Sequence, residues 1–189
     1  IDCKTENNEE GSIAIPLNKL LEITSAISEE NIDISVSDIG KVSIKSEVGK
    51  YTIMGQSCDE FPAEQIVENG TGISISGIEL KNIINNTVYA TSRDDLKPVL
   101  QGVLFQIEEK GFVTVATDGH RMVKFEKKDV NTQEFKGSIV VPCKFLILLN
   151  NKLQEENETT IIIGDNNIQA ILDKGTITSR IIKDPYPDY

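Results

Sequence analysis

The sequence has few of the side chains that most often carry chemistry. Its 189 residues include no tryptophan, one histidine and three cysteines. The cysteines lie far apart and form no C-x-x-C pair, which disfavours a disulfide framework or a zinc ribbon and fits a reducing cytoplasm. No glycine-rich phosphate loop, paired-acid site or HExxH pattern occurs either. We therefore expect no metal, no cofactor and no catalytic residue.

Long apolar runs are also missing. No stretch reaches the roughly 18 consecutive apolar residues of a membrane helix, and the first residues lack the basic and apolar regions of a signal peptide. We expect no membrane association. The sequence begins with Ile1 instead of methionine, so we expect it to start inside a longer protein. Basic residues number 19 against 30 acidic ones, and the net charge of −11 argues against a general affinity for polyanions.

Short apolar patterns predict many strands and few helices. Apolar residues at i, i+3 and i+4 predict helices over 16–27, 77–91 and 142–153. Pro16 and Pro142 suit the first helical position, and Ser76 with Glu79 matches a capping box. Alternation predicts strands over 32–36, 42–44, 51–54, 72–76, 103–107, 112–116, 121–125, 138–141, 160–163, 167–172 and 176–182. The expected fold class is α+β.

The sequence contains an internal repeat. The hexapeptide GSIAIP at 11–16 returns as GSIVVP at 137–142, an offset of 126 residues (142 − 16), and Glu-Glu-Asn at 29–31 returns at 155–157. A smaller similarity relates 72–127 to 138–182, each with the order β-α-β-β-β. We therefore predict one complete module over 72–189, preceded by the second half of another over 1–64, with a polar linker at 65–71.

Several motifs, taken in order, resemble one known family. They are Asp-Glu-Phe-Pro at 59–62, PVLQGVLF at 98–105, TVATDGHRM at 114–122, VVPCK at 140–144 and YPDY at 186–189. Together they resemble the bacterial sliding clamps, the β subunits of DNA polymerase III, over nearly the whole chain. The resemblance implies a DNA clamp fold of three similar domains per subunit, with helices inside and antiparallel sheets outside. Residues 1–64 would be the C-terminal half of domain 1 and 72–189 the central domain, with domain 3 absent.

The resemblance also implies a function. Two subunits would close into a homodimer ring around double-stranded DNA, and this non-catalytic processivity factor would act in the cytoplasm. The polymerase III catalytic subunit, the clamp loader and repair polymerases would bind through short linear motifs. The implied DNA-facing residues are Lys19, Lys81, Arg93, Lys97, Lys144 and Lys152. The implied peptide-binding groove consists of Leu100, Thr117, Gly119, His120, Arg121, Met122 and Pro187.

The sequence departs from the family pattern at a few of these positions. Pro98-Val99 replaces aromatic residues and Cys143 replaces a frequent arginine, so both changes remove potential contacts to nucleic acid. Met122 replaces the usual leucine, a swap that conserves volume. The residues alone leave two other functions open: an α+β protein-interaction domain unrelated to DNA, and a small hydrolase that uses Asp118 and His120. In either case the helix lysines would be ordinary solvated side chains.

Overall fold

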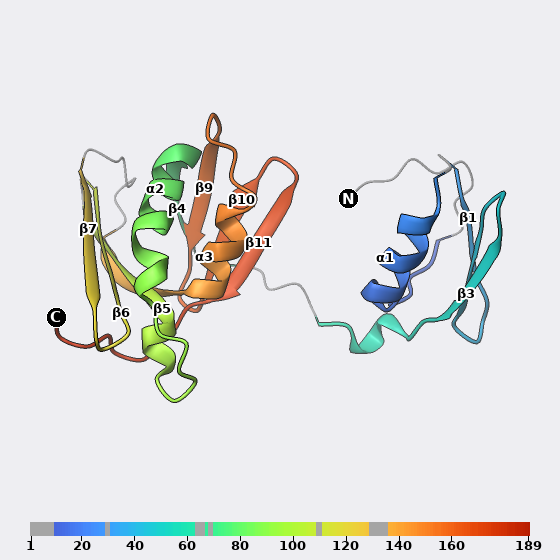
Figure 1. Ribbon diagram of the computed structural model, residues 1–189, viewed down its shortest axis with the longest axis horizontal. Helices are drawn as coiled ribbons and strands as arrows, with labels where there is room; N and C mark the ends of the chain where they lie inside the picture. The colour runs from blue at the N-terminus through green and yellow to red at the C-terminus, as the bar shows by residue number, and fades with distance from the viewer. Residues whose placement is uncertain (1–9, 29–30, 63–66, 68–69, 109–110, 129–135) are drawn as a thin grey trace. The chain divides into compact units, whose positions relative to one another are not determined.

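The structure is a computed structural model that describes residues 10–28, 31–62, 67, 70–108, 111–128 and 136–189 (Figure 1). It divides into two units, residues 2–64 and residues 65–189. Most of the predicted linker at 65–71 lies outside the described residues, but Thr71 is already the first residue of a strand. No described helix is long and apolar enough to cross a bilayer.

The smaller unit packs one helix against one sheet. Helix α1 (Leu17–Ala26) precedes an antiparallel sheet of β1 (Asp33–Val36), β2 (Lys41–Lys45) and β3 (Lys50–Met54), in that order, and a short 3-10 turn η1 (Cys58–Glu60) follows. Its buried core is small: Val42, Ile44 and Ile53, against which apolar residues of α1 pack. Ile34 and Val36 of β1 remain exposed, so this sheet leaves apolar surface uncovered.

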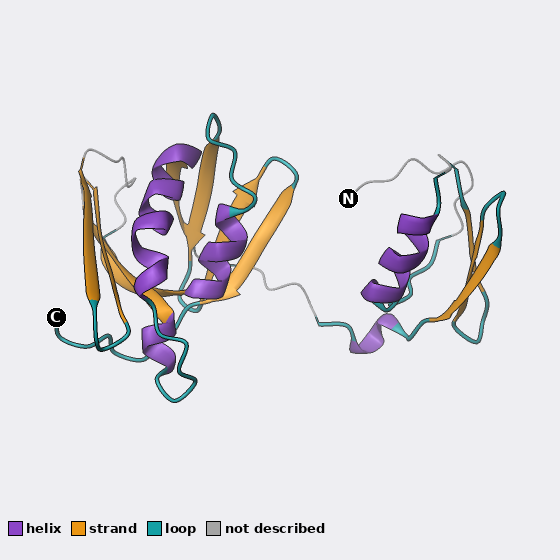
Figure 2. Cartoon of the chain, in the orientation of Figure 1, coloured by secondary structure: helices purple, strands orange, loops and turns teal. Residues whose placement is uncertain are grey.

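The larger unit holds two β-α-β-β-β repeats (Figure 2). The first consists of β4 (Thr71–Ser76), α2 (Gly77–Thr87), the 3-10 turns η2 (Val88–Ala90) and η3 (Pro98–Gln101), β5 (Gly102–Glu108), β6 (Gly111–Thr117) and β7 (Met122–Lys128). The second consists of β8 (Gly137–Pro142), α3 (Cys143–Asn150), β9 (Glu158–Ile163), β10 (Asn167–Leu172) and β11 (Gly175–Arg180). All neighbouring strands are antiparallel, which together with the two helices confirms the α+β class.

Each repeat gives its first strand to the other repeat's sheet. The two four-stranded sheets have the orders β7-β6-β5-β8 and β11-β10-β9-β4. Strand β4 pairs with β9 from Thr71–Ile163 to Ser76–Glu158, and β8 pairs with β5 from Gly137–Ile107 to Pro142–Gly102. Strands β4 and β8 are therefore edge strands, and α2 and α3 each begin directly after one of them.

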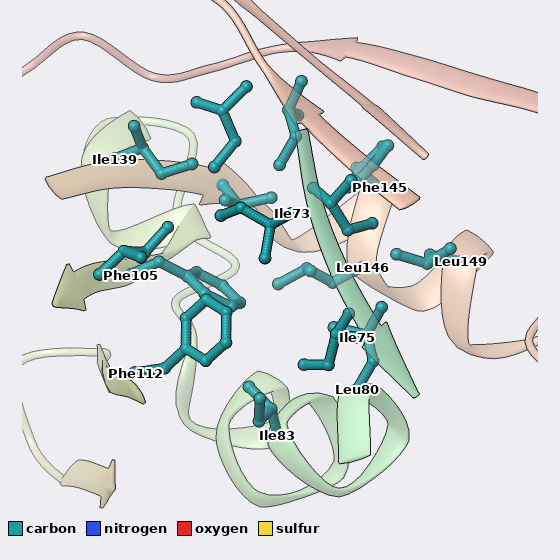
Figure 3. Close-up of a pocket in the computed structure, with 15 residues that line it drawn as sticks. Ile73, Ile75, Leu80, Ile83, Phe105, Phe112, Ile139, Phe145, Leu146 and Leu149 are labelled. Carbon is teal, nitrogen blue, oxygen red and sulfur yellow. The ribbon is translucent and has the colours of Figure 1, made fainter. Parts of the chain in front are cut away.

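The core lies among both sheets and both helices. Side chains from β4, α2, β5, β6 and α3 converge there (Figure 3), and Phe105 meets Phe112 edge to face with ring centroids 6.4 Å apart. The interior gap at this point is only about 30 Å³ and entirely apolar in its lining, a space that stays dry because no polar group would hold a water.

The predicted strands are all present, with ends that differ by at most two residues except in β7, which runs to Lys128 instead of Phe125. One helix end differs more. The helix predicted to reach Thr91 ends at Thr87 and continues as η2, and α3 ends at Asn150 instead of 153. Pro16 and Pro142 are N-cap residues, one position before the one predicted. The capping box is wrong in detail, because the Ser76 hydroxyl donates to the Glu79 carboxylate (2.9 Å) and caps no backbone N–H.

The predicted 126-residue repeat is confirmed in the backbone. Ala14 forms an isolated antiparallel bridge with Gln56, and Val140 forms one with Ile182. Both partners are displaced by the same 126 residues (140 − 14 and 182 − 56). Helices α1 and α3 begin at Leu17 and Cys143, again 126 residues apart (143 − 17). The smaller unit thus repeats the geometry of the second half of the larger one.

Candidate functional site

The turn between β6 and β7 is built around one carboxylate. Asp118 Oδ1 accepts the backbone N–H groups of His120 (2.9 Å) and Arg121 (3.0 Å), and Oδ2 accepts from Arg121 Nε (3.1 Å). The backbone hydrogen bonds, followed by the Arg121 side chain, lower the pKa of Asp118 from its ordinary value. Gly119 has a φ of +91°, the left-handed conformation that glycine adopts without strain.

This turn is fastened to the strand before it and to the end of α2. The Thr117 hydroxyl donates to the Arg121 carbonyl (2.7 Å) and accepts from the Gly119 N–H (3.1 Å). The Arg121 guanidinium also donates to the Tyr89 carbonyl in η2 (2.9 Å). Thr117 and Arg121, both predicted to line a groove, therefore also stabilise the hairpin. The contact of Arg121 with Tyr89, outside the turn, was not predicted from the sequence.

The hydrolase alternative finds no support at this turn. The imidazole of His120 is exposed and makes no hydrogen bond to any described residue, while the Asp118 carboxylate is occupied by three donors of the turn. An acid–base dyad needs those two side chains bonded to each other. Among the residues that the structure describes, no group of three or more His, Cys, Asp or Glu side chains could hold a metal ion.

The predicted groove residues gather at one end of a sheet, with one exception. Met122 pairs with Thr117 across β7 and β6, and its side chain is 52% exposed. Leu100, in η3 just before β5, is at the same end but only 6% exposed, so it offers little surface. Pro187 lines a separate hollow of about 610 Å³ formed by the C-terminal residues with β5 and β8, but it directly follows Tyr186, whose hydroxyl lies beside the Thr117 backbone.

Tyr186 is a candidate site residue that sequence reasoning missed. Its ring packs on a small cluster of Leu104, Val115 and Val140. Its hydroxyl is buried beside the backbone of Thr117 without a well-formed hydrogen bond, and burial raises the pKa of the phenol. The sequence signal for this packing was the alternation in β6, which places Val113, Val115 and Thr117 on one face of the strand. Tyr186 thus supports the strand end that carries the groove residues.

Two of the six predicted DNA-facing side chains are paired with acids. Lys19 bonds Glu22 (3.0 Å) and Lys81 bonds Glu155 (3.2 Å). Arg93, Lys97, Lys144 and Lys152 are exposed, and the structure gives them no ion-pair or hydrogen-bond partner among the described residues. Only Arg93 and Lys144 come together, in a hollow of about 790 Å³ beside the β6–β7 turn. Lys152 lies just beyond the other end of α3, and Lys19 belongs to the smaller unit.

These features define a class of protein: an α+β domain of two strand-exchanged β-α-β-β-β units, preceded by a helix and a three-stranded sheet that repeat the geometry of its second half. The family model for the central domain of the DNA polymerase III beta subunit matches residues 74–188. The chain belongs to this family. The agreement confirms the resemblance that the sequence motifs had indicated.

Relatives and solved structures agree with this assignment. The chain is 32% identical to the beta sliding clamp of Halalkalibacterium halodurans over 96% of its own length and 49% of the relative's. Its fold is similar to the DNA polymerase sliding clamp of Bacillus subtilis (TM-score 0.87, 26% identity, 97% of this chain and 50% of that one). It is equally similar to the DNA polymerase III β subunit of Pseudomonas aeruginosa (TM-score 0.87, 27% identity, 98% and 51%). The chain spans about half the length of these relatives.

Proposed function

We propose that the protein containing this chain is a DNA sliding clamp, a non-catalytic processivity factor that encircles duplex DNA and tethers the replicative polymerase. The observation that carries the proposal is the family match over 74–188 combined with a repeated half-domain before it. Repetition of one domain is how a ring with a constant inner surface is built. An accessory subunit of this kind needs no active site of its own, and a bacterial replication factor would work in the cytoplasm.

The domain boundaries form part of the proposal. Residues 1–64 are the C-terminal half of a first clamp domain, 65–71 are the linker, and 72–189 are the central domain. The paired bridges 126 residues apart support this division, as does the uncovered apolar surface of β1. Strand β1 corresponds to β9, and in the central domain β9 is covered by β4.

Contact with DNA would be weak and independent of base sequence. A ring that slides holds DNA by topology, so its side chains need only screen phosphates. Arg93, Lys97, Lys144 and Lys152 are the candidates whose charges have no partner in the described structure. Lys19 and Lys81 could contact phosphates after giving up exposed ion pairs, which typically contribute less than about 1 kcal/mol.

Partners would bind at the β6–β7 end of the outer sheet. Met122 supplies exposed apolar surface there, next to the polar groups of Thr117, Gly119, His120 and Arg121. Short motifs of the polymerase III catalytic subunit, the clamp loader and repair polymerases are the proposed ligands, and Leu100 and Pro187 would complete the groove. The homodimer ring is likewise proposed for the full-length protein.

The test of the clamp is whether binding depends on DNA topology. Full-length protein, loaded by its clamp loader and ATP onto a nicked circular plasmid, should elute with the DNA from a sizing column. It should be released when a restriction enzyme linearises the plasmid. Equal retention on circular and linear DNA would show binding by affinity instead of encirclement, and no retention on either would favour an interaction domain unrelated to DNA.

A charge reversal extends this test to the proposed inner surface. Lys144→Glu should weaken loading or retention without unfolding the protein, because an exposed helix lysine contributes little to stability. Lys174→Glu, at another exposed lysine in the β10–β11 turn, is the matched control.

A further inference from the structure

The hollow beside the β6–β7 turn has features that phosphate screening does not explain. It is formed by the end of α2 with η2, the loop after it, the turn itself and the start of α3, and its volume is about 790 Å³. That volume is within the range of small-ligand pockets. Among its lining residues are Tyr89, Arg93, Arg121, Lys144 and Ile147.

The charges in the hollow are unevenly satisfied. Both of its acids are bonded to neighbours: Asp118 to three donors of the turn, and Asp95 to the Gln101 side chain (2.8 Å). Arg121 is engaged by Asp118 and by the Tyr89 carbonyl. Arg93 and Lys144 have no such partner among the described residues. The hydrogen bond from the Gln101 amide leaves the charge of Asp95 in place, so the lining carries three cations against two carboxylates, a net charge of +1 (3 − 2). Arg93 and Lys144 are the two cations left for an anion such as a phosphate.

The same hollow presents a flat apolar surface. Tyr89 is 58% exposed, while its backbone is fixed in η2 by the hydrogen bond from Arg121. Val88 and the exposed Ile147 add apolar surface beside it. An exposed aromatic ring on an anchored backbone, next to cations without a partner among the described residues, is the arrangement on which a nucleic acid base stacks while its phosphate is neutralised.

We propose that this hollow binds one nucleotide unit, with the phosphate against Arg93 and Lys144 and the base stacked on Tyr89. Two sources present this chemistry: an unpaired nucleotide of a DNA strand and a free nucleotide. The proposal rests on the proposed function only in taking Arg93 and Lys144 to face DNA. Encirclement of duplex DNA does not require this stacking, since paired bases offer no free face to the aromatic ring of Tyr89.

The test uses the full-length protein and a fluorescently labelled single-stranded oligothymidylate, with binding followed by anisotropy. Tyr89→Ala should weaken binding roughly fivefold or more, and Tyr89→Phe should leave it unchanged, because stacking needs the ring and not the hydroxyl. Arg93→Ala and Lys144→Ala should each make the log–log salt dependence shallower by about 0.7. Lys174→Ala is the control for loss of a lysine outside the hollow.

Competition with thymidine monophosphate separates the two sources. If thymidine monophosphate displaces the oligonucleotide at a similar concentration of phosphate groups, the hollow is a site for a free nucleotide. If it does not, the ligand is an unpaired nucleotide within a strand. Unchanged affinity in Tyr89→Ala would overturn the proposal. If Tyr89→Ala lost oligonucleotide binding and retention on nicked circular plasmid to the same extent, the proposal would also be overturned, because the Tyr89 side chain would then act in holding duplex DNA. Loss of oligonucleotide binding with normal plasmid retention would support the proposal and show that encirclement of DNA does not depend on Tyr89.

Discussion

Truncation of Met122 is the sharpest test of the partner groove. Fully burying a methionine side chain contributes about 1.5–3 kcal/mol. Because Met122 is 52% exposed, about half of this, roughly 0.8–1.6 kcal/mol, is available to a ligand. Met122→Ala in the full-length protein should therefore weaken binding about 4- to 15-fold. Leu100→Ala is a poorer test, since its side chain is only 6% exposed and its loss would cost about 2–5 kcal/mol of stability.

The assay is calorimetric titration with a short peptide that carries glutamine, leucine and phenylalanine. Ile171→Ala is the matched control, because Ile171 is 43% exposed on β10, in the other sheet of the same unit. Light scattering should show an unchanged ring in both variants, since we propose that the subunits meet through clamp domains other than the central one. If Met122→Ala is folded and binds the peptide as tightly as wild type, the groove assignment fails and the turn is only structural.

Two further predictions concern the framework of the site. Gly77→Ala should destabilise the protein by about 1–2 kcal/mol in urea unfolding, despite better helix propensity, because the new Cβ would lie 1.9 Å from the Gln154 carbonyl oxygen. Gly72→Ala, whose Cβ would meet nothing closer than 3.8 Å, should be nearly neutral, and equal stability of the two would contradict the reasoning. Asp118 has a folded pKa below its ordinary value, so its turn bonds should persist above the unfolded pKa and be lost only as pH falls through the folded one. An NMR titration of the Asp118 carboxyl should show this depressed midpoint, and a midpoint at or above the ordinary aspartate value would refute the turn geometry.

Much of the local structure follows from the sequence. Short apolar segments located every described strand, and alternation, the mark of a strand with one buried face, was the signal at 32–36 and 42–44. Asp118-Gly119 marked the β6–β7 turn, since aspartate bonds nearby N–H groups and glycine accepts a positive φ. The 126-residue repeat could be found by comparing the chain with itself, and the bridges at Ala14 and Val140 lie within its two copies at 11–16 and 137–142.

Helix ends were less predictable for a physical reason. Apolar spacing of 3.6 residues persists in the 3-10 turn after α2, so the pattern did not show that the α-helix ends at Thr87. The Ser76 hydroxyl had two acceptable roles, capping a backbone N–H or donating to Glu79, and local sequence does not decide between them. The side-chain positions in the folded chain select one.

Which elements meet depends on long-range packing. The exchange of β4 and β8 between the two repeats is a choice among many possible long-range pairings, and no local pattern encodes it. That exchange brings the start of α3 close to the β6–β7 turn, so Lys144 meets Arg93 and Tyr89 in one hollow. Packing likewise buried Leu100, left Met122 exposed and tied Arg121 to the Tyr89 carbonyl. The strands, the turn and the repeat could be predicted because they depend on neighbours along the chain, whereas the exposure of a side chain and the pairing of its charge depend on neighbours in space.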